Sequence, residues 1–550
     1  MRSKPIRRDV WLFISITAMI LYAVFLLYPL ITLLSRSVMD KTGAFSWANF
    51  QRIFSKAYYL RAMGNSFQVT FAVTLFSVLI ATPLAYLMAV YQIKGKRMLE
   101  ILVLISSMSA PFIGAYSWIM LFGRNGSVTN FLKDLTGFTL PDIYGFPGIV
   151  LVMSLQLYSL VYMFVSGAFK NMDNSLIEAS ESMGCTGIRK VFKVVLPLLL
   201  PTLLAGALMV FMRTFADYGT PRLIGEGYMT LPVLVYNEFM SEVGGNDGLA
   251  AAISIVAVVI TTGVFLIQKL VVNRKQFTMN ALHPITPKKL RGAGSVFAHL
   301  YCYLVVAIAM LPQLYVIYSS FRKTSGKLFV PGFSLNSYKE AFSTVGNSII
   351  NTYTLGFISI AVIVVVAVLI AYVVVRRKNA LNSTLDVVSM FPETVAGSIL
   401  GIALLMGIGP WPLVGTGTVF IMVLSYTIRR LPYTVRSSSA ILQQISPSIE
   451  EASISLGASN MKTFFKVTVP MMLPGVISGA ILSWIMIITE LSTSIILYTT
   501  KTKTMTLEIY SQIIRGNDGI AAAISSILTF STIIALAVFF KVSGKKEVTL

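Results

Sequence analysis

The sequence predicts an all-α polytopic membrane protein made of two tandem six-helix modules, about 12 spans in total, related by a parallel pseudo-twofold repeat. Three observations predict this fold: the composition, the spacing of apolar runs and an internal duplication. The 550 residues are 55% hydrophobic and 12% charged, with a mean hydropathy of +0.77. A soluble domain carries roughly 25% charged residues. This composition therefore excludes a soluble enzyme, a disordered regulator and a secreted disulfide scaffold.

Apolar runs of the length that a helix needs to cross a bilayer, roughly 20 residues, recur along the whole chain. A transmembrane β-barrel would instead alternate in polarity over segments of about ten residues. The tenth run is the weakest, because Arg429 and Arg430 cut it short. The predicted spans are Trp11–Leu34, Asn65–Val90, Ile101–Phe122, Pro147–Phe169, Leu198–Phe215, Ala250–Val272, Phe297–Ser319, Asn351–Val375, Val387–Ile408, Val414–Ile428, Leu473–Leu497 and Ile520–Phe540.

The basic residues predict how these spans are oriented. The chain has 44 Lys and Arg against 22 Asp and Glu, a formal charge of +22, and compact basic clusters occupy residues 94–97 and 376–378. If the basic N-terminus (residues 2–8) is cytoplasmic, the cytoplasmic segments hold the larger share of Lys and Arg, as the positive-inside rule requires. We therefore expect both termini in the cytoplasm, a lipid bilayer around the spans, and no nucleic-acid partner.

The most informative pattern is an internal duplication. Residues 178–201 read EASESMGCTGIRKVFKVVLPLLLP, and residues 451–474 read EASISLGASNMKTFFKVTVPMMLP. The chain is therefore predicted to contain two copies of one unit, each with its loops on the same sides of the membrane. Further matches are GNDGLAAAIS at 245–254 with GNDGIAAAIS at 516–525, and Asn65 and Ala85-Tyr86 with Asn351 and Ala371-Tyr372.

The repeat predicts the domain boundaries. A Pro, Gly and basic stretch between the halves is typical of a solvated connector, and we expect no functional role for its two histidines, His283 and His299. Cys185 and Cys302 are too few for a disulfide framework or a metal site. The predicted segments are an N-terminal span and outer loop (1–60), module 1 (61–272), a cytoplasmic linker (273–296), a seventh span and outer loop (297–346), module 2 (347–541) and a cytoplasmic tail (542–550).

A polar loop between the fourth and fifth spans of each half is patterned as a short helix. A serine three positions before a glutamate predicts a capping box, with the carboxylate in the first helical turn. A glycine farther on predicts a helix end with positive φ. A second short amphipathic segment then leads to a proline at the start of the next span. The matched residues are Ser175 and Ser448, Glu178 and Glu451, and Gly184 and Gly457.

This loop resembles the EAA loop of binding-protein-dependent ABC importer permeases, and the six-span layout of each half is similar to the type I importer fold. The resemblance implies that each loop is a coupling helix that docks on one of two ATP-binding subunits, expected as a homodimer. It also implies an extracytoplasmic substrate-binding protein, a bacterial cell membrane and no cofactor. Glu450 is an extra acid before the second motif. The alternative is a capped helix that only completes the bundle surface. The implied docking residues are Glu178, Ala179, Gly184, Glu451, Ala452 and Gly457.

ATP hydrolysis is expected in a partner subunit and not in this chain. A phosphate-binding loop of the form G-x-x-x-x-G-K-[S/T] uses its glycines and lysine to hold the nucleotide phosphates. The Gly-Lys pairs at 95–96, 326–327 and 544–545 lack the upstream glycine and the following hydroxyl. We therefore expect a non-enzymatic conduit.

Ionisable residues inside spans cost about 2.5–3.5 kcal/mol each on insertion scales, so each one is a candidate for function. Asp217 and Glu490 stand at repeat-equivalent positions after the prolines that begin the fifth and eleventh spans. Together they predict a translocation pathway lined by one acid from each half. Arg213 either neutralises Asp217 at helical spacing or attracts an anionic substrate; alternatively, the two acids assist the passage of a cation. Glu393 is a further pathway candidate, whereas Gly397 and Gly401 predict close helix packing.

The fused layout and the segment DYGTPRLIGEGYMTLPVLVY after the fifth span resemble the ferric-iron permeases of this superfamily. The resemblance implies ferric iron as the substrate. Related importers for phosphonates, sugar phosphates, thiamine, sulfate or polyamines stay open as alternatives. An ion-coupled secondary transporter is the rival from another class, but it gives no reason for duplicated docking helices. A membrane-embedded enzyme lacks a His, Asp and Glu cluster in the sequence.

Overall fold

The structure is a computed structural model that describes residues 10–40, 42–108, 110–170, 172–241, 246–274, 283, 285–412 and 414–543. Three predictions therefore lie wholly or partly outside the described residues. They are the basic N-terminus, the cytoplasmic tail from residue 544 onward, and residues 275–282 and 284 of the linker.

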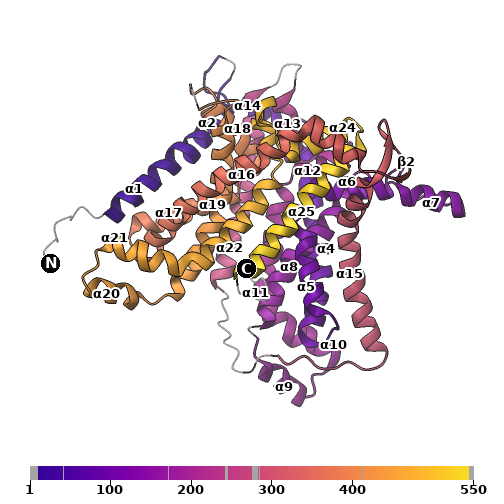
Figure 1. The fold of residues 1–550 in the computed structure, drawn as a ribbon, viewed down its shortest axis with the longest axis horizontal. Helices are drawn as coiled ribbons and strands as arrows, with labels where there is room; N and C mark the ends of the chain where they lie inside the picture. The colour runs from indigo at the N-terminus through magenta and orange to yellow at the C-terminus, as the bar shows by residue number, and fades with distance from the viewer. Residues whose placement is uncertain are drawn as a thin grey trace. The chain divides into compact units, whose positions relative to one another are not determined.

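The chain forms two compact helical units (Figure 1). Unit 1 comprises Met1–Phe50, Ser241–Ile255 and Lys323–Lys546, and unit 2 comprises Gln51–Met240, Val256–Arg322 and Glu547–Leu550. The first span therefore packs with the second half of the chain, and the seventh span packs with the first half. This exchange of the first span of each half does not follow from the order of helices in the sequence.

Unit 2 is built around three long helices, α4, α8 and α11, which pack against one another. Helix α15 packs along α5 and α6 in the same unit. The elements are α4 (Ala57–Val90), α5 (Lys96–Met108), α6 (Pro111–Phe122), α7 (Ser127–Thr136), α8 (Phe146–Lys170), α9 (Asn174–Ser182), α10 (Gly187–Lys190), η2 (Val191–Val195), α11 (Leu196–Phe215), α12 (Gly219–Ile224), α13 (Leu231–Met240) and α15 (Ala293–Ser320).

Unit 1 repeats this arrangement with α16, α19 and α22 at its centre and α1 and α2 packed against α17 and α18. Its elements are α1 (Val10–Tyr22), η1 (Ala23–Leu27), α2 (Tyr28–Ser37), β2 (Leu328–Phe333), α16 (Asn336–Arg376), α17 (Ala380–Met390), η3 (Phe391–Glu393), α18 (Gly397–Gly407), α19 (Val419–Gln444), α20 (Pro447–Ser455), α21 (Asn460–Thr463), η4 (Phe464–Thr468), α22 (Val469–Ile488), α23 (Ser494–Leu497), η5 (Thr500–Thr502), α24 (Met505–Ile514) and α25 (Asp518–Ser543). Three elements span the division between the units, namely α3 (Ala48–Ser55), α14 (Asp247–Arg274) and β1 (Arg322–Ser325), which pairs with β2.

Within the described residues, 9 helices are long and apolar enough to cross a membrane, or up to 11 if each of two bent pairs counts as one span. The bent pairs replace the predicted third and ninth spans, and they bend by 97° and 110°. A proline lies close to each break: Pro111 begins α6 directly after the first, and Pro392 lies in η3, which ends at Glu393 just before the second. Proline removes a backbone donor and clashes with the preceding turn, so the apolar run cannot continue as one straight helix.

Helix α19 corresponds to the tenth predicted span, Val414–Ile428. The prediction ends this span at Ile428 because of Arg429 and Arg430, whereas the helix begins at Val419 and continues through both arginines to Gln444. It packs between α16 and α22, as α8 packs between α4 and α11. The charges lower the hydropathy of the segment without ending the helix, because Arg is a good helix former.

The duplication holds at the level of single residues. The elements α10, η2 and α11 of the first half and α21, η4 and α22 of the second begin and end at equivalent positions of the repeat. Three π-helical turns occur in the part of the chain that the structure describes, η1, η2 and η4. Each ends directly before an X-Pro pair: Tyr28-Pro29, Leu196-Pro197 and Val469-Pro470. The wider turn accommodates a proline that cannot donate to the preceding carbonyl groups.

Equivalent side-chain contacts support the same alignment. Asn65 Nδ2 donates to the carbonyl of Met229 (3.0 Å), and Asn351 Nδ2 donates to that of Lys503 (3.0 Å). The hydroxyls of Ser66 and Thr352 accept the backbone N–H groups of Leu231 and Met505, both at 2.7 Å. The segment after the fifth and eleventh spans is therefore held in the same way in both halves.

Candidate functional site

The first helical loop runs from α9 through Gly184 to α10. The carboxylate of Asp173 accepts the backbone N–H of Ser175 (2.9 Å) and caps α9. Glu178 Oε1 accepts from Asn174 Nδ2 at 2.6 Å. Only Ile177 and Ser180 of α9 are buried, so one narrow edge of the helix attaches it to unit 2.

The second helical loop runs from α20 through Gly457 to α21. Here Ser446 is the cap, and its hydroxyl lies 3.4 Å from the backbone nitrogen of Ser448. None of the residues of α20 is buried. Figure 1 shows α9 next to α10 and α20 next to α21, each pair at one end of its own unit.

The predicted capping residues are therefore wrong by two positions. Ser175 and Ser448 lie inside the first turn, and Asp173 and Ser446 are the caps. Asp and Ser are both strong N-cap residues. The sequence offered several such residues in a row, and the backbone conformation chose between them.

The predicted helix ends at the two glycines are confirmed. Gly184 has a φ of 78° and Gly457 a φ of 91°. In the first copy the N–H of Gly184 donates to Glu181 O (3.0 Å) and that of Cys185 to Ser180 O (2.9 Å). The second copy has the same pair of bonds, so both helices end in a Schellman motif, for which glycine at this position is preferred.

All six predicted docking residues are exposed: Glu178, Ala179, Gly184, Glu451, Ala452 and Gly457. Two apolar side chains beside the glycines are also exposed, Met183 to 81% and its repeat equivalent Leu456 to 90%. The sequence prediction did not include these two residues. Their signal was an apolar residue directly before the helix-ending glycine in each copy.

Different contacts hold the two loops in place. In the first, Glu181 Oε1 lies 2.5 Å from Lys190 Nζ and Oε2 lies 3.4 Å from Lys288 Nζ of the linker. The hydrogen bond from Lys190 holds the pKa of Glu181 below its ordinary value. Lys288 also pairs by its backbone with Val90 and Gln92, so part of the linker is attached beside the first loop.

In the second loop, the extra acid Glu450 has the anchoring role. Its Oε1 accepts from Arg376 Nε (2.9 Å) and its Oε2 from the hydroxyl of Tyr372 (3.2 Å). Arg376 also donates to the carbonyl of Ile445, just before α20 (2.8 Å). Glu450, the residue that departs from the motif, therefore fixes α20 to the end of α16. The motif residue Glu451 is exposed beside it.

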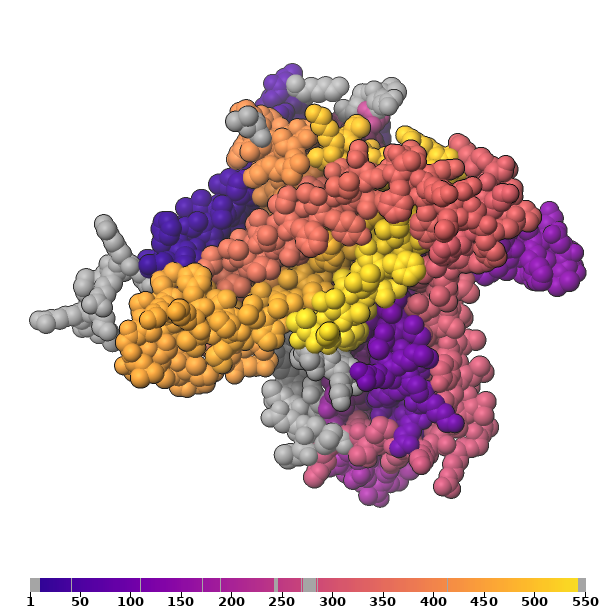
Figure 2. Space-filling model, viewed as in Figure 1, coloured from indigo at the N-terminus to yellow at the C-terminus, as the bar shows by residue number. Residues whose placement is uncertain are grey.

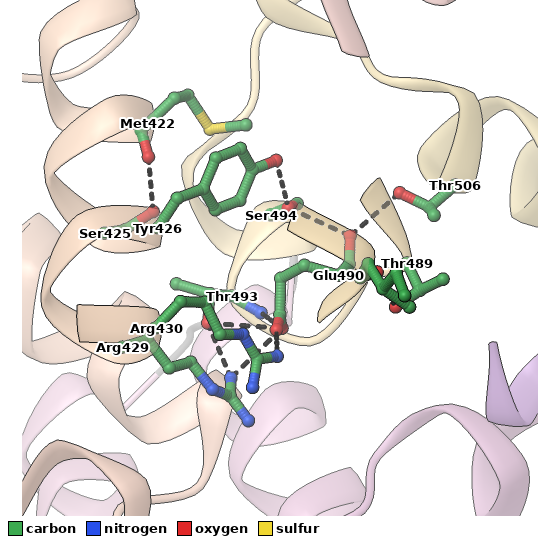
Figure 3. Close-up of polar contacts among 11 residues, drawn as sticks. Met422, Ser425, Tyr426, Arg429, Arg430, Thr489, Glu490, Thr493, Ser494 and Thr506 are labelled. Carbon is green, nitrogen blue, oxygen red and sulfur yellow. Dashed lines mark hydrogen bonds and ion pairs between the residues drawn. The ribbon is translucent and has the colours of Figure 1, made fainter. Parts of the chain in front are cut away.

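A buried charge cluster surrounds Glu490 in unit 1 (Figure 3). Arg429 Nη1 donates to Glu490 Oε1 at 3.0 Å and to Thr493 Oγ1 at 2.7 Å, and Arg430 Nη2 donates to Glu490 Oε2. The Glu490 side chain is only 3% exposed. Removing a carboxylate from water requires compensating charge, and here two guanidinium groups supply it.

Glu490 and Asp217 lie at equivalent places, two residues beyond the ends of α22 and α11. The backbone N–H of Thr493 donates to Glu490 (3.2 Å), and that of Thr220 donates to Asp217 (2.9 Å). Each acid thus caps the turn that follows its span. Helix α11 ends at Phe215, so Asp217 lies just beyond the helix that contains Arg213.

The packing role predicted for two glycines agrees with the structure. A Cβ atom on Gly397 would lie 1.6 Å from Arg429 Nη1, and one on Gly401 would lie 2.9 Å from Ile496 Cβ. Gly397 therefore leaves the space that the guanidinium group occupies. Glu393, in η3, contributes negative charge near Arg430.

Sequence reasoning missed several charged residues of the second half. The sequence pattern places the end of a span at Arg429 and Arg430, and it does not predict the ion pair of Lys503 Nζ with the buried Glu508 Oε2 (2.5 Å). The signal for the arginines was their position in the helix equivalent to α8, where the first half has Gln156 and Leu157. Two arginines that occur in only one copy of the repeat predict an acid in the same half of the chain that neutralises them.

The comparison with protein families decides the class of the protein. The profile of the binding-protein-dependent transport system inner membrane component matches residues 1–276 and 363–544, more than half of the chain. The chain belongs to this family. It is therefore a multi-pass inner membrane permease of an ABC importer, with two six-helix modules fused in one polypeptide. A permease of this family works with ATP-binding subunits and a substrate-binding protein.

Individual relatives match the permease over different lengths. It is 25% identical over 533 residues to the ferric transport system permease protein FbpB of Actinobacillus pleuropneumoniae, which covers 94% of this chain and 76% of that protein. It is 22% identical over 273 residues to the putative 2-aminoethylphosphonate transport system permease protein PhnU of Salmonella typhimurium, which covers 49% and 94%. A solved bacterial alginate ABC transporter, in complex with an alginate pentasaccharide-bound periplasmic protein, is 18% identical with a TM-score of 0.42, covering 48% of this chain and 95% of that one.

Proposed function

We propose that two identical ATP-binding subunits dock on α9 and α20 and drive the permease. The observation that carries this proposal is the repeat of one exposed helix–glycine–helix motif, with an exposed apolar side chain, Met183 or Leu456, beside each glycine. An apolar residue at the centre of a polar surface is typical of a protein interface. The ion pair of Arg376 and Glu450 joins α20 to α16, and the ion pair of Glu181 and Lys190 joins α9 to α10, which continues through η2 into α11. A force applied to either loop is therefore transmitted to a long helix of its own unit.

In this proposal the permease is the conduit and its partners hydrolyse ATP. The chain has no G-x-x-x-x-G-K-[S/T] stretch to hold nucleotide phosphates. Closure of the ATP-binding subunits moves the two loops. This movement opens the substrate path alternately to the two sides of the membrane. Both loops and both termini lie on the cytoplasmic side, as the distribution of Lys and Arg favours.

Charge reversal in the loops tests the docking. Glu178→Arg and Glu451→Arg, singly and together, are purified with the ATP-binding subunits, and subunit recovery and ATP hydrolysis in proteoliposomes are measured. The double variant should lose at least ten-fold in both. Asn174→Ala is the matched control for the first loop, because it removes the local hydrogen bond to Glu178 and leaves the acid in place.

A second control is Glu340→Arg, which reverses an exposed acid of α16 outside the loops. If the double loop variant assembles and transports as well as this control, the docking proposal is wrong. Uptake by proteoliposomes that contain the permease without ATP-binding subunits would also contradict the docking proposal and would support ion-coupled secondary transport.

We infer that the substrate is ferric iron. The support is the match over 94% of this chain to a protein named as a ferric transport permease. The half-length match to a 2-aminoethylphosphonate permease keeps a phosphonate as the alternative. Sugar phosphates, thiamine, sulfate and polyamines follow as further alternatives of the same importer class.

Uptake with the cognate substrate-binding protein separates these substrates. Proteoliposomes that contain the full importer receive the binding protein with either radioactive ferric iron or radioactive 2-aminoethylphosphonate. ATP-dependent uptake of iron alone supports the inference. Uptake of the phosphonate alone contradicts the iron assignment and leaves the docking proposal intact.

The predicted pathway residues divide into two groups. We propose that Glu490 positions the turn after α22, because both of its carboxylate oxygens are bound by arginines. Arg213, Asp217 and Glu393 stay candidates for the translocation pathway. Conservative variants of these three should change the uptake rate at unchanged ATP-binding subunit recovery.

A further inference from the structure

Helix α7 presents an exposed apolar face that no function discussed so far uses. Phe131 is 64% exposed, Leu135 68%, and Phe138, two residues after the end of the helix, 60%. Phe131 and Leu135 are four residues apart and therefore lie on the same side of the helix. In Figures 1 and 2, α7 extends away from α6, the helix that precedes it in the same unit.

The other sides of α7 are polar or attached to unit 2. Thr129 is buried, whereas Lys133 and Asp134 are exposed. Gly137, with a φ of 70°, ends the helix after ten residues. A short helix with an apolar side, a charged side and a fixed end is the pattern of a segment that lies in a membrane interface.

Neighbouring aromatic residues fix the depth at which α7 begins. The hydroxyl of Ser127, its first residue, is hydrogen-bonded to the hydroxyl of Tyr315 near the end of α15, and the Tyr315 ring lies 6.0 Å from that of Tyr318. At the end of α6, Trp118 stacks on Phe122 at 5.4 Å. Trp and Tyr concentrate where spans leave the bilayer.

The spans beside α7 have their own lipid-facing surface. Leu300, Leu304 and Leu314 of α15 are 60%, 51% and 59% exposed, as expected of a helix that faces acyl chains. The Ser127–Tyr315 contact attaches the first residue of α7 to this helix.

We propose that α7 is an interfacial anchor, which lies in the lipid headgroup region with Phe131, Leu135 and Phe138 inserted among the acyl chains. Lys133, on the opposite side of the helix, then faces water. The anchor fixes the segment between α6 and α8 at the membrane surface, so this connection stays at one depth while the helices around it move. The partner is the lipid bilayer, and the proposal does not depend on the substrate or on the docking loops.

An environment-sensitive dye on α7 tests this proposal. Full-length permease with Cys185→Ser and Cys302→Ala receives an NBD dye at Phe131→Cys, Leu135→Cys or Lys133→Cys and is placed in phosphatidylcholine–phosphatidylglycerol nanodiscs. Quenching is measured with a lipid nitroxide near the headgroup and with aqueous iodide. The dyes at positions 131 and 135 should be quenched at least three-fold more by the lipid nitroxide than the dye at position 133, and iodide should show the reverse order.

Two outcomes overturn the proposal. Equal quenching of all three positions by iodide means that the apolar side faces water. Protection of positions 131 and 135 from both quenchers means that protein covers them. Position 135 provides a second readout if the Phe131→Cys protein folds poorly, and Lys133→Cys is the matched control on the same helix.

Discussion

The Nη1 atom of Arg429 lies 3.0 Å from Oε1 of Glu490, and this pair joins the middle of α19 to the turn after α22. Arg430 binds the other oxygen of the same carboxylate. The equivalent acid of the first half, Asp217, has Gln156 and Leu157 at the positions of the two arginines. The two halves therefore share a fold and differ in the charge at this junction.

Glu490→Gln should destabilise the permease far more than Asp217→Asn does. Removing one partner of a buried ion pair leaves uncompensated charge and costs about 3–5 kcal/mol. Thermal unfolding in detergent, followed by tryptophan fluorescence, measures the difference. Replacing Arg429, Arg430 and Glu490 with Gln, Leu and Gln removes all three buried charges together, and it should recover most of the loss. Equal destabilisation by both single variants would contradict the asymmetry.

Gly397→Ala should disrupt the same cluster without changing any charge. The added Cβ would lie 1.6 Å from Arg429 Nη1 and would displace the guanidinium group from Glu490. We expect a fall in unfolding temperature and in ATP-dependent uptake. Gly167→Ala in α8 is the control, since its Cβ would meet nothing within 4 Å, and it should be neutral or slightly stabilising. An Ala at position 397 that behaves like this control would refute the contact.

The glycines that end α9 and α20 should tolerate only residues that adopt positive φ. Nothing lies within 4 Å of an added Cβ at Gly184 or Gly457, so backbone conformation alone decides the effect. Asn enters the left-handed region readily, whereas Val does so at a cost of about 1–2 kcal/mol. Gly457→Asn should keep most of the stimulated ATP hydrolysis, and Gly457→Val should lose most of it at normal permease yield. Similar activity of the two variants would mean that the Schellman geometry is not needed for coupling.

Acidification should loosen the first loop. The Lys190 hydrogen bond lowers the pKa of Glu181 from 4.5, so the stabilisation is present above pH 4.5 and is lost as the pH falls through the folded-state value. A spin label at Met183→Cys, in a Cys185→Ser background, should become more mobile below pH 4.5. In Glu181→Gln the mobility should be high at every pH. If the mobility of the label changes with neither the pH nor the Glu181→Gln substitution, the ion pair does not hold the loop.

Much of the fold could be predicted from the sequence because membrane insertion depends on local composition. Long apolar runs must become helices in a bilayer, where each backbone polar group has to be paired within its own segment. The repeat could also be detected in the sequence. Motif residues such as Gly184 and Gly457 have a backbone conformation with positive φ, which few residues other than glycine adopt. The six exposed motif residues follow from the same local pattern.

Tertiary structure decided what composition leaves open. The caps Asp173 and Ser446, the continuation of α19 through Arg429 and Arg430, and the exchange of the first span of each half depend on which neighbours each segment meets. In the sequence alone, an arginine in an apolar run predicts the end of a span. The structure shows that an acid distant in sequence lies beside this arginine and neutralises it. Local chemistry therefore determined the helices and the loops, and long-range packing determined where their charges are paired.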